Sequence, residues 1–141
     1  MYRLKTSAEF DSAHFLAGYN GKCANIHGHR WKIEVVVKSS ELTAGGEKRG
    51  MVVDFADFKK AVRTLAKSFD HVLIYEKGSL KAATLAALND ENFRLIEVDF
   101  RPTAENFAKH FYGILKAEGL PVESVVVYET PENCACYEEG N

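Results

Sequence analysis

Two stretches near the N-terminus alternate apolar and polar residues, which is typical of strands with one buried face. In the first stretch, which starts at Tyr2, the apolar residues share their parity with His14. In the second, which starts at His27, they share their parity with His29. Residues 18–21 (GYNG) have the composition of a turn, so we predict an antiparallel hairpin. The three histidines should then lie on one inward side.

Two later stretches carry apolar residues at steps of three and four, which predicts helices with one buried face. Asp54 is a suitable N-cap for the first, whose apolar positions run from Phe55 to Phe69. Thr103 is a suitable N-cap for the second, and Gly119 should end it. Both helices are expected to pack on the sheet.

The remaining segments are shorter. Residues 78–92 fit a short helix, residues 93–100 alternate as a strand, and the valine-rich residues 122–129 form a last strand that ends at Glu129. This order predicts one α+β domain over residues 1–141, with an antiparallel four-stranded sheet and two main helices on one face. The open edges of such a sheet favour side-by-side association of subunits.

Composition narrows the class of protein. A chain of 141 residues is long enough for one domain with its own core. With 18 basic and 20 acidic residues the net charge is only -2, so we expect no general affinity for nucleic acid or for anionic membranes. Three cysteines, an odd number, and an N-terminus without an apolar signal core indicate a reduced, cytoplasmic protein.

The spacing His27-Gly28-His29 is the strongest chemical signal in the chain. Residues two apart in a strand point the same way, so both rings can reach one metal ion, with His14 as the third ligand. Three protein ligands and an open fourth position are typical of catalytic zinc, although other divalent ions also suit imidazoles. The alternative is that these are half-exposed histidines without a ligand.

Other residues could work beside such an ion. A bound zinc polarises a substrate oxygen and acidifies the neighbouring C–H, so a base is needed, and Cys23 qualifies if the ion or Lys22 favours its thiolate. Cys23 could instead be a fourth ligand that closes a structural site. Asp70 and His71 follow the first helix, where they could supply the opposing proton.

Three residues at the ends of elements are candidates for substrate binding. Glu129 could accept two parallel hydrogen bonds from a guanidine-like edge, and Thr103 and Glu105 could add contacts from a helix start. Alternatively, all three only cap or solvate their elements. Cys134 and Cys136, one residue apart and without a second pair, are interpreted as structural or incidental.

Taken together, these residues resemble the 6-pyruvoyl tetrahydropterin synthase family, in the same order and across nearly the whole chain. Three residues separate Cys23 from His27, as in the bacterial branch of 6-carboxytetrahydropterin synthases. The matching segments are Phe10-Asp-Ser-Ala-His14, Cys23-x-x-x-His27-Gly-His29, Val53-Asp54-Phe55, Asp70-His71, Pro102-Thr103-Ala-Glu105 and Tyr128-Glu129-Thr130.

The resemblance implies a tunnelling fold (T-fold), with subunit sheets joined into a barrel and two trimers stacked into a homohexamer. It implies a zinc-dependent carbon-carbon lyase that converts 7,8-dihydroneopterin triphosphate and water into 6-carboxytetrahydropterin, acetaldehyde and triphosphate, in queuosine biosynthesis. The implied roles are zinc ligation by His14, His27 and His29, general base for Cys23, proton relay for Asp70 and His71, and pterin binding for Glu129.

The chain also departs from the family pattern. Many members place an asparagine shortly after the Asp-His pair, where this chain has Val72-Leu73-Ile74-Tyr75, and residues 77–98 are longer than in compact members. We expect this insert to alter the subunit interface. The triphosphate should be met by basic residues at the mouth of the site, of which Lys22 is the nearest in sequence to Cys23.

Three other functions fit part of the pattern. A pyruvoyl-forming synthase would act on the same substrate, and a non-catalytic module would use zinc only to stabilise a pterin-binding fold. A metal-dependent hydrolase would need a carboxylate base near the ion, for which Asp11 and Glu9 are the available candidates.

Overall fold

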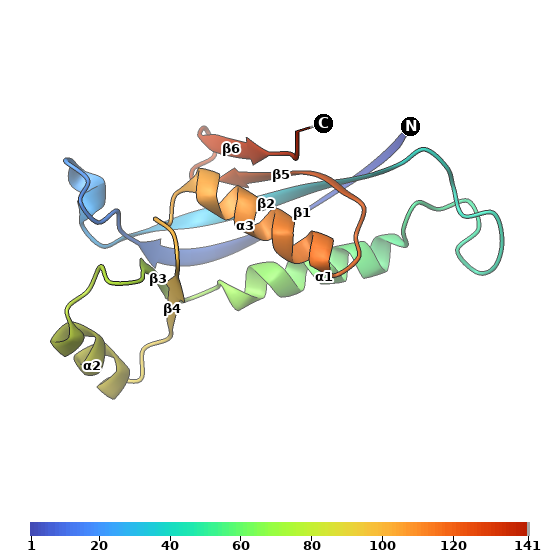
Figure 1. Cartoon of the computed structure of the whole chain (residues 1–141). Coiled ribbons are helices and arrows are strands. Elements are labelled where there is room, and N and C mark those ends of the chain that lie inside the picture. The colour runs from blue at the N-terminus through green and yellow to red at the C-terminus, as the bar shows by residue number, and fades with distance from the viewer. Residues whose placement is uncertain (141) are drawn as a thin grey trace.

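A long antiparallel hairpin forms the centre of the molecule (Figure 1). In this computed structural model, which describes residues 1–140, β1 (Tyr2–His14) pairs with β2 (His27–Ser39) along its whole length. The register runs from Tyr2 opposite Ser39 to His14 opposite His27. The predicted hairpin is therefore present, and its two histidine-bearing ends coincide.

The sheet is larger than predicted and is mixed. It has six strands in the order β4-β3-β1-β2-β5-β6, where four antiparallel strands were expected. β5 (Val122–Tyr128) pairs antiparallel with β2, and β6 (Cys134–Tyr137) pairs antiparallel with β5. On the other side, β3 (Leu73–Glu76) pairs parallel with β1, and β4 (Leu95–Val98) pairs parallel with β3.

The two strands that were missed are both short. β3 and β6 have only four residues each, and an apolar run of that length shows no usable periodicity. Residues 93–100 do contain a strand, but it is limited to Leu95–Val98. The parallel pairing of β3 with β1 is short, with Ala13 and His14 opposite Leu73 and Ile74. This pairing places the segment that follows His71 beside the histidine end of β1.

The predicted helices are confirmed. α1 (Phe55–Ser68) begins at Asp54, whose side chain accepts hydrogen bonds from two backbone N–H groups of the first turn. α3 (Ala104–Ala117) begins at Thr103, whose hydroxyl oxygen accepts from the N–H of Asn106. Each cap satisfies donors that the helix itself cannot pair.

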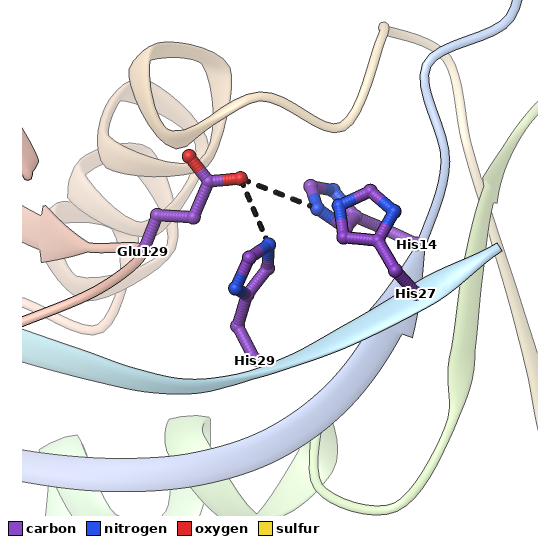
Figure 2. Close-up of side chains that lie close together, drawn as sticks. All are labelled: His14, His27, His29 and Glu129. Atoms are coloured by element: carbon purple, nitrogen blue, oxygen red, sulfur yellow. Dashed lines mark ion pairs between the residues drawn. The ribbon is translucent and has the colours of Figure 1, made fainter. Parts of the chain in front are cut away.

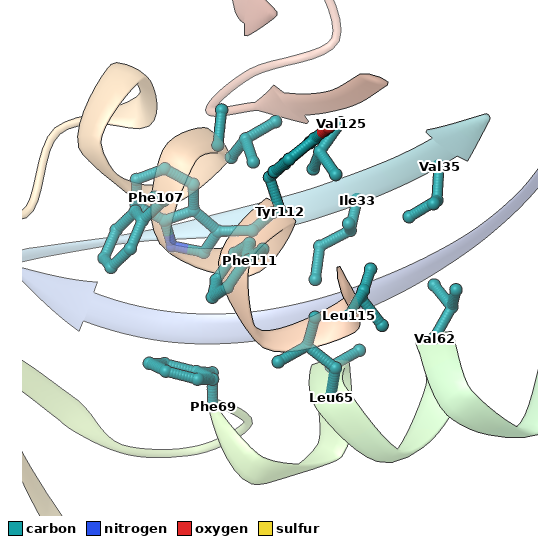
Figure 3. Packing of buried hydrophobic residues seen from close by; sticks show 14 of the residues in the cluster. Ile33, Val35, Val62, Leu65, Phe69, Phe107, Phe111, Tyr112, Leu115 and Val125 are labelled. Atoms are coloured by element: carbon teal, nitrogen blue, oxygen red, sulfur yellow. The ribbon is translucent and has the colours of Figure 1, made fainter. Parts of the chain in front are cut away.

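The core lies between the inward face of the sheet and these two helices (Figure 3). Alternate residues of β2 from Trp31 to Val37 are fully buried, whereas residues of the opposite parity remain accessible. The ring of Trp31 contacts Phe10, Phe107 and also His14, whose ring centroid lies 4.9 Å away. The histidine end of the hairpin is thus anchored directly on the aromatic core.

The insert forms the least covered part of the structure. Helix α2 (Ala82–Asp90) has no buried residue and projects away from the sheet, at the lower left of Figure 1. A short turn of 3-10 helix, η1 (Lys22–Ala24), lies in the connection between β1 and β2. Within residues 1–140, no helix combines the length and the apolar character that crossing a membrane requires.

Candidate metal centre

The hairpin register brings three imidazole rings together, and we call His14, His27 and His29 the histidine cluster (Figure 2). His14 lies opposite His27, while His29 lies two residues further along β2, on the same face. The ring centroids are 4.6 Å apart for His14 and His27, 5.2 Å for His14 and His29, and 4.9 Å for His27 and His29. All three pairs of rings are therefore close to each other.

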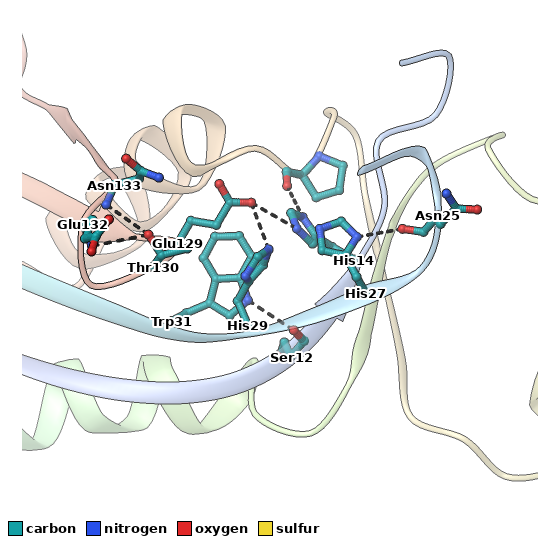
Figure 4. Close-up of polar contacts among 11 residues, drawn as sticks. Ser12, His14, Asn25, His27, His29, Trp31, Glu129, Thr130, Glu132 and Asn133 are labelled. Carbon is teal, nitrogen blue, oxygen red and sulfur yellow. Dashed lines mark hydrogen bonds and ion pairs between the residues drawn. The ribbon is translucent and has the colours of Figure 1, made fainter. Parts of the chain in front are cut away.

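Backbone carbonyls orient two of these rings. His14 Nδ1 lies 2.7 Å from the carbonyl oxygen of Pro102, and His27 Nδ1 lies 2.7 Å from that of Asn25 (Figure 4). A carbonyl oxygen can only accept, so each Nδ1 must carry the proton. In the neutral ring the lone pair is then on Nε2, which is the usual arrangement of a histidine that binds a metal.

The three Nε2 atoms are buried and have no hydrogen-bond partner among residues 1–140. Such groups are rare in folded proteins and need an explanation, such as an ion. Burial lowers the pKa of His14 and of His29 below the ordinary value of 6.5, although Glu129 acts in the opposite direction. Neutral imidazoles are the form that a metal ion requires.

Glu129 belongs to this site, although the sequence indicated only a ligand-binding role for it. Its Oε1 atom lies 3.4 Å from His14 Nε2 and 3.1 Å from His29 Nε2. One ligand atom from each histidine and one from Glu129 all lie within 4.8 Å of one another. We call His14, His27, His29 and Glu129 the four-residue group.

A strand-parity signal could have placed Glu129 there. Val125 and Val127 of β5 are fully buried, and Glu129 follows with the same parity. Tyr128 is opposite Lys32, so the next residue lies beside Trp31, on the inward face of β2. The pairing of β5 with β2, which brings Glu129 next to the histidines, could not be predicted from the local sequence pattern.

The donor set of the four-residue group fits a divalent cation. One nitrogen of each imidazole and a carboxylate oxygen lie within 4.8 Å of one another, and electron pairs this close repel each other unless positive charge lies between them. Imidazole nitrogen and carboxylate oxygen are both common zinc ligands, and they also suit other first-row divalent ions.

Cys23 lies near this group in the chain but not within it. The residue is half-buried in η1, and its carbonyl oxygen accepts a hydrogen bond from the N–H of Leu16 at 2.8 Å. Its sulfur is not among the mutually close ligand atoms of the described residues. The geometry thus disfavours Cys23 as a fourth metal ligand. Its neighbour Lys22 is exposed.

Asp70 and His71 form a separate pair. Asp70 Oδ2 lies 2.8 Å from His71 Nδ1, and Asp70 Oδ1 accepts from the N–H of Asp11 at 2.8 Å. These contacts, that of Asp11 first, lower the pKa of Asp70 below 3.8. His71 has a φ of 54° and a side chain that is 75% exposed. It shares a cavity of about 570 Å³ with His29, lined also by Leu88 and Phe93.

Thr103 and Glu105 lie at the start of α3, just after Pro102. Thr103 follows Pro102, whose carbonyl oxygen orients His14, but the Thr103 hydroxyl already caps α3. Glu105 is exposed in the first turn of α3. The capping alternative is therefore present for Thr103. Among residues 1–140, no hydrogen bond or ion pair joins the side chain of Thr103 or Glu105 to the four-residue group.

Two basic residues near the site were missed at the level of sequence. A groove of about 630 Å³, which we call the Glu129 groove, is lined by Glu129, His29, Arg30, Lys32 and Tyr128, among others. Arg30 contacts Glu9 at 2.9 Å, and the Lys32 ammonium lies 5.4 Å from the centre of the Tyr128 ring. Their position on the strand that carries His29 was the available signal.

Comparison with known proteins gives a consistent result. The family model described as 6-pyruvoyl tetrahydropterin synthase matches residues 3–140. The chain is 36% identical to a 6-carboxy-5,6,7,8-tetrahydropterin synthase of Haemophilus influenzae, over 99% of this chain and 100% of that protein.

Solved structures show the same fold. An uncharacterised protein of Wolinella succinogenes aligns with a TM-score of 0.82 at 22% identity, over 99% of this chain and 98% of that one. The 6-pyruvoyl tetrahydropterin synthase of Caenorhabditis elegans aligns with a TM-score of 0.69 at 22% identity, over 99% and 96%. The predicted α+β tunnelling fold is thus confirmed, and the chain belongs to the 6-pyruvoyl tetrahydropterin synthase family.

Proposed function

We propose that this protein is a zinc-dependent 6-carboxy-5,6,7,8-tetrahydropterin synthase. It would convert 7,8-dihydroneopterin triphosphate and water into 6-carboxytetrahydropterin, acetaldehyde and triphosphate, a carbon-carbon lyase reaction of queuosine biosynthesis. The observation that carries the proposal is the histidine cluster, with three buried Nε2 atoms that lack hydrogen-bond partners. The name of the relative that is 36% identical supports the choice of this reaction within the family.

His14, His27 and His29 would hold the zinc. When bound, the ion would supply Lewis-acid chemistry, polarising a substrate oxygen and making the neighbouring C–H more acidic. The Pro102 and Asn25 carbonyls would keep two of the rings in the tautomer that ligation needs.

Proton transfer would involve two separate sites. Cys23 would remove a carbon-bound proton as its thiolate, which is the reactive form of a cysteine. The His71 ring would donate the opposing proton. Asp70 would orient this ring, because its Oδ2 atom lies 2.8 Å from His71 Nδ1. The exposure of His71 would let it regain that proton from solvent.

Binding of the pterin would depend on the carboxylate of Glu129. A carboxylate can accept two parallel hydrogen bonds from the N–H groups of the pterin's amino-pyrimidinone edge. Thr103 and Glu105 would add contacts from the start of α3. Lys22, with Arg30 and Lys32 from the Glu129 groove, would meet the triphosphate.

The assembly is proposed as a homohexamer of two stacked trimers in the cytoplasm, built from single-domain subunits. The edge strands β4 and β6 leave backbone groups free to pair with a neighbouring subunit. The uncovered helix α2 would lie near one of these joints, next to β4 in the sequence.

The experiment that tests the function is product analysis. The purified zinc-loaded protein is incubated with 7,8-dihydroneopterin triphosphate, and the pterin is identified by mass spectrometry. We expect 6-carboxytetrahydropterin together with acetaldehyde. A pyruvoyl product without acetaldehyde would favour the pyruvoyl-forming activity, and substrate binding without turnover would favour a non-catalytic pterin-binding module.

A further inference from the structure

Two candidate partners compete for the Glu129 carboxylate, because two parallel hydrogen bonds from a pterin would use both of its oxygens. Its oxygen lies among the three imidazoles of the histidine cluster, yet the proposed function needs the same group to accept hydrogen bonds from a pterin. We propose that Glu129 is a displaceable fourth metal ligand. It binds the ion in the substrate-free protein and leaves the ion when a pterin takes its carboxylate.

The distances already fit ligation. In a tetrahedral zinc site with bonds of about 2.0–2.1 Å, neighbouring ligand atoms lie about 3.3–3.4 Å apart. Glu129 Oε1 lies 3.4 Å from His14 Nε2 and 3.1 Å from His29 Nε2. The carboxylate needs only a small adjustment to serve as the fourth ligand, so the substrate-free site is closed.

The side chain has no competing partner. Within residues 1–140, the Glu129 carboxylate makes ion-pair contacts only with His14 and His29, and no lysine, arginine or backbone N–H binds it. The side chain is only 30% exposed, so the carboxylate is partly removed from water. A carboxylate in this setting gains most from a cation at the centre of the cluster.

The backbone around Glu129 is held while its side chain is free to turn. The Glu129 N–H donates to the carbonyl oxygen of Asn133 at 3.0 Å, and the Thr130 hydroxyl oxygen accepts from the N–H groups of Glu132 and Asn133 (Figure 4). Glu129 also lines the groove of about 630 Å³ beside the cluster. Within residues 1–140, only the contacts to His14 and His29 restrain this carboxylate, so it can turn about its side-chain bonds without moving the strand.

This arrangement couples binding of the pterin to the opening of a coordination position on the metal ion. A site closed by Glu129 binds other ligands poorly, and the N–H edge of the correct substrate opens the coordination position by engaging the carboxylate. The displacement half of this proposal rests on the proposed function. The ligation half does not, because it concerns only the metal and the substrate-free protein.

Zinc affinity tests the ligation half. Competition with a chromophoric chelator is measured for the substrate-free protein, for Glu129→Ala and for Glu132→Ala, which removes the same charge from the same turn. Loss of one ligand should weaken zinc binding at least about tenfold in Glu129→Ala, in line with the losses known for groups around metal sites. The Glu132→Ala protein should match the parent.

Equal zinc affinity of Glu129→Ala and the parent would overturn ligation. Circular dichroism and thermal unfolding of the metal-free proteins establish that each variant is folded. If Glu129→Ala does not fold, Glu129→Gln replaces it, because the amide keeps the shape but is a weaker ligand. The measurement of zinc affinity does not depend on turnover. A protein that is inactive but whose zinc affinity depends on Glu129 would therefore refute the proposed function and still support ligation of the ion by Glu129.

Azide binding to the cobalt-substituted protein tests displacement. The parent should bind azide weakly and Glu129→Ala should bind it tightly, as seen in the visible absorption of Co²⁺. Adding 2-aminopyrimidin-4-one, which has the N–H edge of a pterin but lacks its second ring, should strengthen azide binding to the parent and leave Glu129→Ala unchanged. An unchanged azide affinity of the parent in the presence of saturating pyrimidinone would overturn displacement.

Discussion

The histidine cluster and the Asp70–His71 pair both place imidazole near carboxylate, yet their surroundings are opposite. In the cluster the Nε2 atoms are buried without partners, and burial lowers the pKa of His14 and His29. In the pair each oxygen of the Asp70 carboxylate has a partner, and the His71 side chain is 75% exposed. The buried imidazole nitrogens of the cluster are suited to bind a cation. The exposed His71 ring, paired with Asp70, is suited to exchange protons with solvent.

The largest effect is expected for His27→Ala, which removes one ligand from the cluster. The three imidazoles are expected to provide most of the affinity for the ion, so zinc content measured by atomic absorption should fall far below the parent level, and turnover should be lost with it. His110→Ala serves as the control, because His110 packs against Phe69 and Phe100 and lies outside the cluster. Retention of zinc by His27→Ala would break the assignment of the cluster as a metal site.

Cys23→Ala should separate chemistry from metal binding. Removal of a general base typically costs about 10²–10⁴-fold in rate, so kcat should fall by this factor. Zinc content and thermal stability should stay at the parent level, because the Cys23 sulfur is not part of the four-residue group. Cys134→Ala, at an exposed cysteine of β6, is the matched control. A loss of zinc together with activity would instead identify Cys23 as a ligand.

His71→Ala tests the proposed role of the Asp70–His71 pair in proton transfer. We expect a loss in kcat of about 10²-fold, at the lower end for a general acid, with unchanged zinc affinity. Asp70→Asn should lose less, because the ring remains and only its hydrogen-bonded partner changes. A zinc affinity that falls in His71→Ala would mean that the two regions are not independent.

The smallest effect concerns stability and pH. The folded pKa of Asp70 lies below its ordinary value of 3.8, so the unfolded chain binds more protons in the range below that value. The stability that Asp70 contributes is complete above pH 3.8 and is lost as the pH falls through the folded pKa. In metal-free protein, Asp70→Asn should therefore be destabilised at pH 7 and approach the parent at the acid end.

Urea unfolding at several pH values measures this difference. Asp90→Asn, at an exposed position of α2, gives the control for the loss of one carboxylate. A constant difference between Asp70→Asn and the parent down to the lowest accessible pH would show that the Asp11 and His71 contacts do not act through the charge of Asp70.

Regular periodicity predicted most of the fold. The alternation along Tyr2–His14 and His27–Ser39 identified the long hairpin, and the caps at Asp54 and Thr103 identified where the main helices begin. β3 and β6 were missed because four residues contain too few alternations to distinguish a strand from a loop. The parallel direction of β3 and β4 depends on how the chain crosses between them, which local patterns do not record.

Counting residues along a strand was enough to predict that His27 and His29 point to one face and that His14 points to the inward face of its own strand. Only the folded chain shows that Glu129 joins the three histidines while Cys23 stays outside the group, and that Asp70 pairs separately with the exposed His71. These distances depend on the pairing of β5 with β2 and on the path of the β1–β2 connection. Such contacts join residues far apart in the chain, and only the packed core brings them within reach.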